Sequence, residues 1–98
     1  MKILVVCNAG MSSSILVKKI KEYAQSQGIE AVVQAVSSAS VSDEVGNWDV
    51  CLVAPQIMYA VDEIKGKLNI PTQAVEMRTY AIADGKAAFE QINNMLKG

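Results

Sequence analysis

Two short runs of uninterrupted apolar residues, at positions 3–6 and 50–54, constrain the fold more than any other feature of the sequence. A strand with one face in water alternates apolar and polar residues, whereas a parallel strand buried on both faces is apolar throughout. Segments with apolar residues at helical spacing follow each run. The sequence therefore predicts a parallel sheet covered by helices.

The rest of the chain divides into further strands and helices. We predict strands at residues 2–6, 30–36 and 49–54, and a weaker one at 73–77 near an edge of the sheet. Helices are predicted at 14–27, with Gly28 as the stop, at 57–68 and from Asp84–Gly85 onward, and residues 37–46 are predicted to form a loop with a short helix. The inner faces of the three helices are expected to carry Leu16, Val17, Ile20, Tyr23 and Ala24, then Ile57, Val61, Ile64 and Leu68, then Ala88, Phe89, Ile92, Met95 and Leu96.

This order of elements predicts the fold class. It is α/β, a three-layer sandwich in which a four-stranded parallel sheet carries helices on both faces. Right-handed crossovers, with a reversal of winding between the first and third strands, give the strand order 2-1-3-4. Residues 1–98 are expected to form a single domain. Ligands of such sheets bind beyond the carboxyl ends of the strands, at the point where the winding reverses.

Composition excludes several classes of function. Charged residues make up 19% of the chain and the formal net charge is −1, so no basic face for nucleic acid is expected. No segment has the roughly 18 to 20 apolar residues of a membrane span, nor the apolar core of a signal peptide. We therefore expect a cytoplasmic protein whose two cysteines stay reduced. Histidine is absent and the cysteines are far apart, so we expect no metal and no organic cofactor.

The best candidate site is the loop that joins the first strand to the first helix. It reads Cys-Asn-Ala-Gly-Met-Ser-Ser-Ser over residues 7–14. Backbone N–H groups and the positive end of the helix dipole converge at such a loop and bind phosphate or another anion. We expect Cys7 to be the catalytic nucleophile, and the phosphate-binding residues to be Asn8, Ala9, Gly10, Met11, Ser12, Ser13 and Ser14. The alternative is a buried structural thiol followed by serines that only cap the helix.

The second cysteine is expected to be inert. If the first and third strands are parallel neighbours, Cys7 lies level with Ala54 and three residues from Cys51. That offset is roughly 10 Å along the strand, beyond the roughly 7 Å limit for a disulfide. Cys51 stands inside an apolar run, where cysteine behaves as a small hydrophobic residue.

Four further residues are predicted to line the rim of the loop. The same register places Pro55 and Gln56 beside it, and Tyr80 and Asp84 precede the last helix at the same end of the sheet. Gln56 either donates to a bound phosphate or a partner protein, or is an ordinary polar residue of a turn. For Asp84, capping the last helix is a sufficient role by itself.

These residues resemble a known family. The loop at 7–14 is similar to the phosphocysteine loop of the enzyme IIB proteins of the bacterial sugar phosphotransferase system, in the lactose/cellobiose/chitobiose branch. Pro55-Gln56-Ile57 after the third strand and Tyr-Ala-Ile-Ala-Asp-Gly at 80–85 match as well, and the resemblance covers essentially the whole chain.

The resemblance implies a phosphoryl carrier. Cys7 would accept a phosphoryl group from a phosphohistidine on enzyme IIA and transfer it to a sugar of the cellobiose, lactose or chitobiose type, translocated by the membrane protein enzyme IIC. The carrier would be a monomer in the cytoplasm, transiently at the inner face of the membrane through enzyme IIC. Family members carry serine or another small polar residue where this chain has Asn8, which leaves the role of that side chain open.

Two other classes remain as alternatives. Low-molecular-weight phosphatases and related arsenate reductases resemble this arrangement, but they carry arginine where this chain has Ser13, followed by a hydroxyl that Ser14 supplies. Without that arginine, no bidentate cation faces the transferred group, and Asp84 is the only candidate for the leaving-group acid. A non-catalytic receiver-like module would need acidic residues where Cys7 and Asn8 stand, and a dinucleotide site would need more glycines than the loop has.

Overall fold

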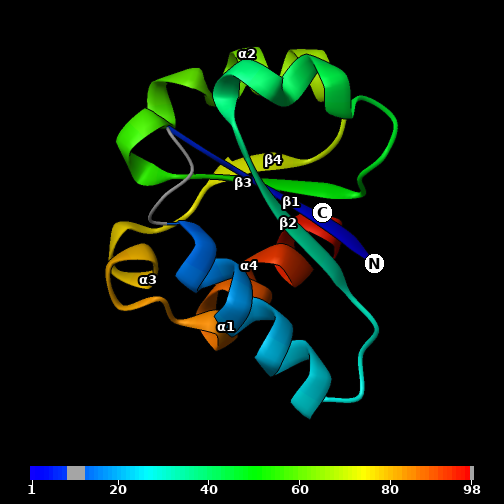
Figure 1. Cartoon of the computed structure of the whole chain (residues 1–98), viewed down its shortest axis with the longest axis vertical. Coiled ribbons are helices and arrows are strands. Elements are labelled where there is room, and N and C mark those ends of the chain that lie inside the picture. Colours follow the sequence, from blue (N-terminus) through cyan, green and yellow to red (C-terminus); the bar gives the residue numbers. More distant parts are fainter. Residues whose placement is uncertain (9–12, 98) are drawn as a thin grey trace.

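The computed structural model describes residues 1–8 and 13–97, without the side chain of Ser13. Four strands form one parallel sheet in the order β2-β1-β3-β4, which confirms the predicted fold class and strand order (Figure 1). The elements in chain order are β1 (Lys2–Cys7), α1 (Ser13–Ser26), β2 (Val32–Ser37), the 3-10 helix η1 (Ser38–Glu44), β3 (Val50–Val53), the 3-10 helix η2 (Pro55–Ala60), α2 (Val61–Leu68), β4 (Thr72–Ala74), α3 (Met77–Ile82) and α4 (Gly85–Lys97).

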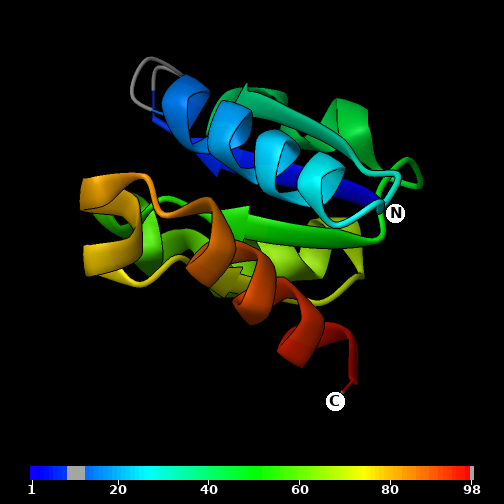
Figure 2. The same cartoon turned by 90° about the horizontal axis from the view of Figure 1, so that it is seen from below.

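Helices cover both faces of the sheet, and each face has its own core. Figures 1 and 2 show α1 and α4 on one side of the sheet and α2 on the other. We call the first core the α1/α4 cluster; it contains Ile3, Val5, Leu16, Val17, Ile20, Ala24, Val33, Val50, Leu52, Val75, Ala88, Phe89, Ile92 and Met95. The second, the α2 cluster, contains Leu4, Val6, Cys7, Val41, Cys51, Val53, Ala54, Ile57, Ile64 and Leu68.

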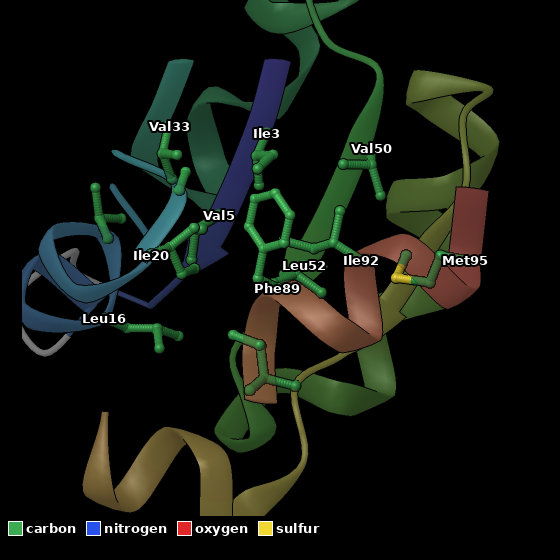
Figure 3. Close-up of a cluster of buried hydrophobic side chains, with 14 residues drawn as sticks. Ile3, Val5, Leu16, Ile20, Val33, Val50, Leu52, Phe89, Ile92 and Met95 are labelled. Atoms are coloured by element: carbon green, nitrogen blue, oxygen red, sulfur yellow. The ribbon is translucent and has the colours of Figure 1, made fainter. Parts of the chain in front are cut away.

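The central strands are apolar throughout because both of their faces are buried. Along β1, Ile3 and Val5 point into the α1/α4 cluster, while Leu4 and Val6 point into the α2 cluster. Figure 3 shows the ring of Phe89 from α4 among side chains of β1 and β3. This two-sided burial is the physical reason for the uninterrupted apolar runs in the sequence.

The register of the sheet agrees with the prediction from sequence. Strands β1 and β3 pair Leu4 with Cys51 and Val6 with Val53. The N–H of Ala54 donates to the carbonyl of Val6 at 2.8 Å, which keeps Ala54 level with the end of β1. Gly28 has a φ of +69° and ends α1, as predicted.

Three details of the prediction are wrong. The strand predicted at 73–77 is β4 at 72–74, and Met77 begins the short helix α3, which has too few buried positions to show a helical pattern. The α-helix predicted from residue 57 begins at Val61, because the chain after Pro55 turns through a 3-10 helix with a kink at Ile57. Leu96 is 42% exposed instead of inward-facing, since the last turn of α4 lies at the margin of the molecule (Figure 2).

None of the helices within residues 1–8 and 13–97 combines the length and the apolar character needed to cross a membrane.

Candidate functional site

Cys7 is the last residue of β1, at the carboxyl edge of the sheet. It pairs with Ser37 of β2, and its side chain is 1% exposed. The thiol donates to the carbonyl oxygen of Val36, with 3.7 Å between sulfur and oxygen. The next residue, Asn8, is exposed and lies in a bend. The thiol therefore sits at the boundary between the core and the surface, where β1 leaves the sheet.

The start of α1 lies at the same end of the sheet (Figure 1). Ser13 is the first residue of this helix, and Ser14 is exposed in its first turn. The first turn contains no acidic residue, so no carboxylate of its own opposes the positive end of the helix dipole. The predicted phosphate-binding residues Ala9, Gly10, Met11 and Ser12 lie outside the described residues. The described part of the site thus combines a thiol with a helix start that favours anions.

A groove of about 650 Å³ lies at this end of the molecule. Its walls come from the start of α1, the start of η2, and the first residue and the C-terminal half of α3. Much of its lining is exposed apolar surface: Ile15 is 58% exposed, Met77 68% and Ile82 62%. Contiguous exposed apolar surface of this kind commonly marks an interaction site. The lining residues are Ile15, Pro55, Gln56, Met77, Tyr80, Ala81, Ile82 and Ala83.

Three of the four predicted rim residues meet in this groove. Pro55 is buried and starts η2, Gln56 is exposed, and Tyr80 is half-buried against both core clusters. Asp84 is not among the lining residues. Its Oδ1 accepts the backbone N–H of Ala87 at 3.0 Å, so it caps α4 in the role that the sequence suggested as sufficient.

Cys51 lies inside β3 and is buried, as predicted. Its side chain is 0% exposed, and its thiol donates weakly to the carbonyl of Leu52, with a sulfur–oxygen distance of 3.8 Å. Burial raises the pKa of the Cys51 thiol from 9.0 to about 12, because the core cannot solvate a thiolate. Both cysteines are free thiols.

Sequence reasoning missed most of the groove. Ile15 could have been predicted as part of an interaction surface, because it is a large apolar residue that lies outside the inner face of α1 and close behind the loop. Met77 is missed because the sequence predicts it as the end of a strand. Ile82 falls inside the matching segment 80–85, but nothing in the sequence indicates that its side chain faces a groove. Their place in the groove follows from α3, which the sequence pattern did not reveal.

The fold and the site define a class: small α/β proteins that present a cysteine at the carboxyl edge of a doubly wound parallel sheet. Residues 2–91 match the family described as "PTS system, Lactose/Cellobiose specific IIB subunit". The chain therefore belongs to this family and is a phosphotransferase component of a sugar phosphotransferase system, as the resemblance implied.

Individual relatives span nearly the whole chain. The oligo-beta-mannoside-specific EIIB component of Bacillus subtilis (strain 168) is 39% identical over 98 residues, which cover 97% of this chain and 95% of the relative. The cellobiose-specific EIIB component of Lactococcus lactis subsp. lactis (strain IL1403) is 28% identical, with 96% and 94% covered.

Solved structures have the same fold. The solution structure of the cellobiose-specific phosphotransferase IIB component from Borrelia burgdorferi matches with a TM-score of 0.79 and 33% identity, over 97% of this chain and 90% of that one. The lactose-specific IIB component domain from Streptococcus pneumoniae matches with a TM-score of 0.80 over 95% of each chain. At 22% identity, this second match supports the fold alone.

Proposed function

We propose that the protein carries phosphoryl groups on Cys7. The observation that supports this most is the position of Cys7, the one of the two thiols that stands at the carboxyl end of a strand, at the same edge as the start of α1. Cys51 lies in the sheet interior with a pKa raised to about 12. Only Cys7 combines a nucleophilic atom with a nearby group that stabilises negative charge.

The proposed cycle has two transfers. In the first, the thiolate of Cys7 attacks the phosphorus of a phosphohistidine on enzyme IIA; a sulfur–phosphorus bond forms, the nitrogen–phosphorus bond breaks, and its electron pair stays on the imidazole. In the second, a hydroxyl of the sugar on enzyme IIC attacks the same phosphorus; the sulfur–phosphorus bond breaks, the hydroxyl proton leaves, and the Cys7 thiolate is restored.

We assign binding of the transferred group to residues 8–14. The structure describes three residues of this segment, Asn8, Ser13 and Ser14, the second of them without its side chain. The remaining residues are Ala9, Gly10, Met11 and Ser12. The binding groups would be largely backbone N–H groups, aided by the dipole of α1. The negative charge shared by three phosphoryl oxygens is stabilised next to the start of α1, because the first turn of this helix contains no acidic residue.

The groove beside this edge is the proposed docking surface for the phosphoryl donor. Pro55, Gln56 and Tyr80 would contact enzyme IIA there, together with the exposed apolar side chains of α1 and α3. A carrier must release each partner after every transfer, so we expect weak complexes. The sugar would be of the cellobiose, lactose or chitobiose type that the resemblance implies, or an oligo-β-mannoside. The names of the family and of its relatives mention cellobiose, lactose and oligo-β-mannosides.

Mass spectrometry tests the proposal directly. The protein is incubated with phosphorylated enzyme IIA of the same system, under conditions that preserve acid-labile phosphocysteine, and the modified residue is located by fragmentation. One phosphoryl group on Cys7 is expected. Phosphate on Cys51 or on a loop serine of the folded protein would contradict the proposal.

The phosphatase alternative is the one that most needs a separate test. This protein has serine instead of arginine at position 13. The carboxylate of Asp84 already accepts a hydrogen bond from a backbone N–H in the cap of α4. We therefore expect negligible hydrolysis of p-nitrophenyl phosphate, since the loss of even one preorganised donor typically lowers such rates about 100- to 1,000-fold. Brisk hydrolysis that depends on Cys7 would favour a phosphatase.

A further inference from the structure

The first residue of α4 lies directly against the backbone of α1. Gly85 is buried, and a Cβ atom there would overlap with the carbonyl oxygen of Lys19 and lie 2.5 Å from its carbonyl carbon. Both atoms belong to the main chain inside a helix, so neither can turn aside as a side chain can. Since ordinary van der Waals contact begins at 3.4 Å, any larger residue would push the two helices apart by about 1 Å.

The corner between α3 and α4 transmits such a shift, because hydrogen bonds fix it on both sides. Ala83 has a φ of 53° and ends α3, with its own N–H bonded to Tyr80 and the N–H of Asp84 bonded to Thr79. This pair of bonds is a Schellman motif. Asp84 then caps α4 through Ala87, so only Ala83 and Asp84 separate the two helices.

The two helices at this corner differ in how firmly the core holds them. The inner side chains Ala88, Phe89 and Ile92 of α4 are fully buried in the α1/α4 cluster. In α3 only Thr79 is buried, while Met77 and Ile82 are exposed and form a wall of the groove. A displacement at Gly85 therefore moves α3, which is weakly held, relative to α1.

We propose that the corner of Ala83, Asp84 and Gly85 sets the width of the groove between α1 and α3, and thereby the fit of the phosphoryl donor. Gly85 is in this sense a positioning residue: it acts through α3 and does not itself line the groove. This inference rests on the proposed function, because it takes the groove as the docking surface of enzyme IIA. The contact between Gly85 and Lys19 holds α3 at the separation from α1 that the donor recognises.

The test is Gly85→Ala, with the rate of Cys7 phosphorylation measured against the concentration of phosphorylated enzyme IIA. We expect the half-saturating concentration to rise about tenfold, since a 1 Å misplacement at a positioned site has effects of this order or larger. The maximal rate should change much less, because Cys7 and α1 stay in place on the sheet. In amide NMR spectra, the largest shifts should fall on residues 77–83.

Two control variants separate positioning from general effects. Gly66→Ala makes the same substitution in α2, where a Cβ meets nothing within 4 Å, and should leave the half-saturating concentration unchanged. Ile92→Val and Ile92→Ala lower stability through the same core without touching the corner. If an Ile92 variant of equal stability raises the half-saturating concentration as much as Gly85→Ala does, the positioning role is refuted.

A further variant covers the case in which Gly85→Ala does not fold. Asp84→Ala removes the acceptor for the N–H of Ala87 and loosens the corner while Gly85 keeps its contact. It should raise the half-saturating concentration by a smaller factor, and no change would overturn the inference. If the wild-type protein is not phosphorylated on Cys7 at all, the proposed function fails; the NMR shifts of α3 then still decide whether Gly85 sets its position.

Discussion

The two cysteines occupy neighbouring strands and the same core cluster, yet they stand in different chemical situations. Cys7 and Cys51 both lie in the α2 cluster, and their side chains are 1% and 0% exposed. Cys51 is the second residue of β3, level with Leu4, with fully buried residues on either side. Cys7 is the last residue of β1, and the exposed Asn8 follows it. The two thiols therefore differ in their position along the strand, although their exposed fractions are almost the same.

The largest expected effect is the loss of phosphoryl transfer in Cys7→Ala. This variant removes the only thiol at the carboxyl edge, so we expect no phosphoryl acceptance from enzyme IIA. Cys51→Ala is the matched control: it removes a sulfur atom from the same cluster and should still accept one phosphoryl group. Acceptance by Cys7→Ala, measured by intact-protein mass spectrometry, would break the comparison between the two sites.

The second prediction concerns alkylation of the native protein with iodoacetamide. A local displacement of the end of β1 suffices to expose Cys7, whereas Cys51 becomes accessible only when the central strands separate. Because global opening costs at least about 5 kcal/mol in a stable domain, we expect Cys7 to react at least about 100-fold faster. Peptide mapping over time measures both rates in one sample. Equal rates would show that the two thiols are equally accessible.

Position along a strand was predictable from the sequence because parallel strands with buried faces have a readable register. The apolar runs at 3–6 and 50–54 fixed which strands are central, and counting back from their carboxyl ends placed Cys7 level with Ala54. The strand order followed from the alternation of strands and helices. The features that the sequence predicted correctly, namely the central strands, their register and their order, therefore all depend on strands that are buried on both faces.

Pro55, Gln56 and Tyr80 were predicted at the site, but the helical wall that α3 forms could not be predicted, for the opposite reason. Helix α3 has one buried residue, Thr79, and so leaves no periodic pattern in the sequence. The contact of Gly85 with Lys19 joins positions far apart in the chain, and a glycine at the start of a helix gives no sign of what it lies against. Such features depend on how two helices approach each other.

A smaller effect is expected when a hydroxyl replaces the buried thiol. Cys51→Ser should lower the free energy of unfolding by about 1 to 3 kcal/mol, because the core around residue 51 is apolar and solvates a hydroxyl poorly. Chemical denaturation measures this loss, with Cys51→Ala as the reference for the missing volume. Phosphoryl acceptance by folded Cys51→Ser should be retained. A variant as stable as the wild type would mean that the site is more polar than the structure shows.

The last prediction sharpens the comparison through pH. The pKa of Cys51 is about 12 in the folded protein and 9.0 without burial, so above pH 9 the unfolded chain loses a proton that the folded protein keeps. The unfolded state then binds fewer protons, and the free energy of unfolding must fall as pH rises. The stability that depends on the protonated Cys51 thiol is fully present below pH 9. It is lost between pH 9 and about 12, at no more than about 1.4 kcal/mol per pH unit.

Denaturation curves of wild type and Cys51→Ala between pH 8 and 10.5 isolate this loss of stability, because the other titrating groups are common to both proteins. Parallel curves across that range would show that the Cys51 thiol ionises as easily in the folded protein as in the unfolded chain.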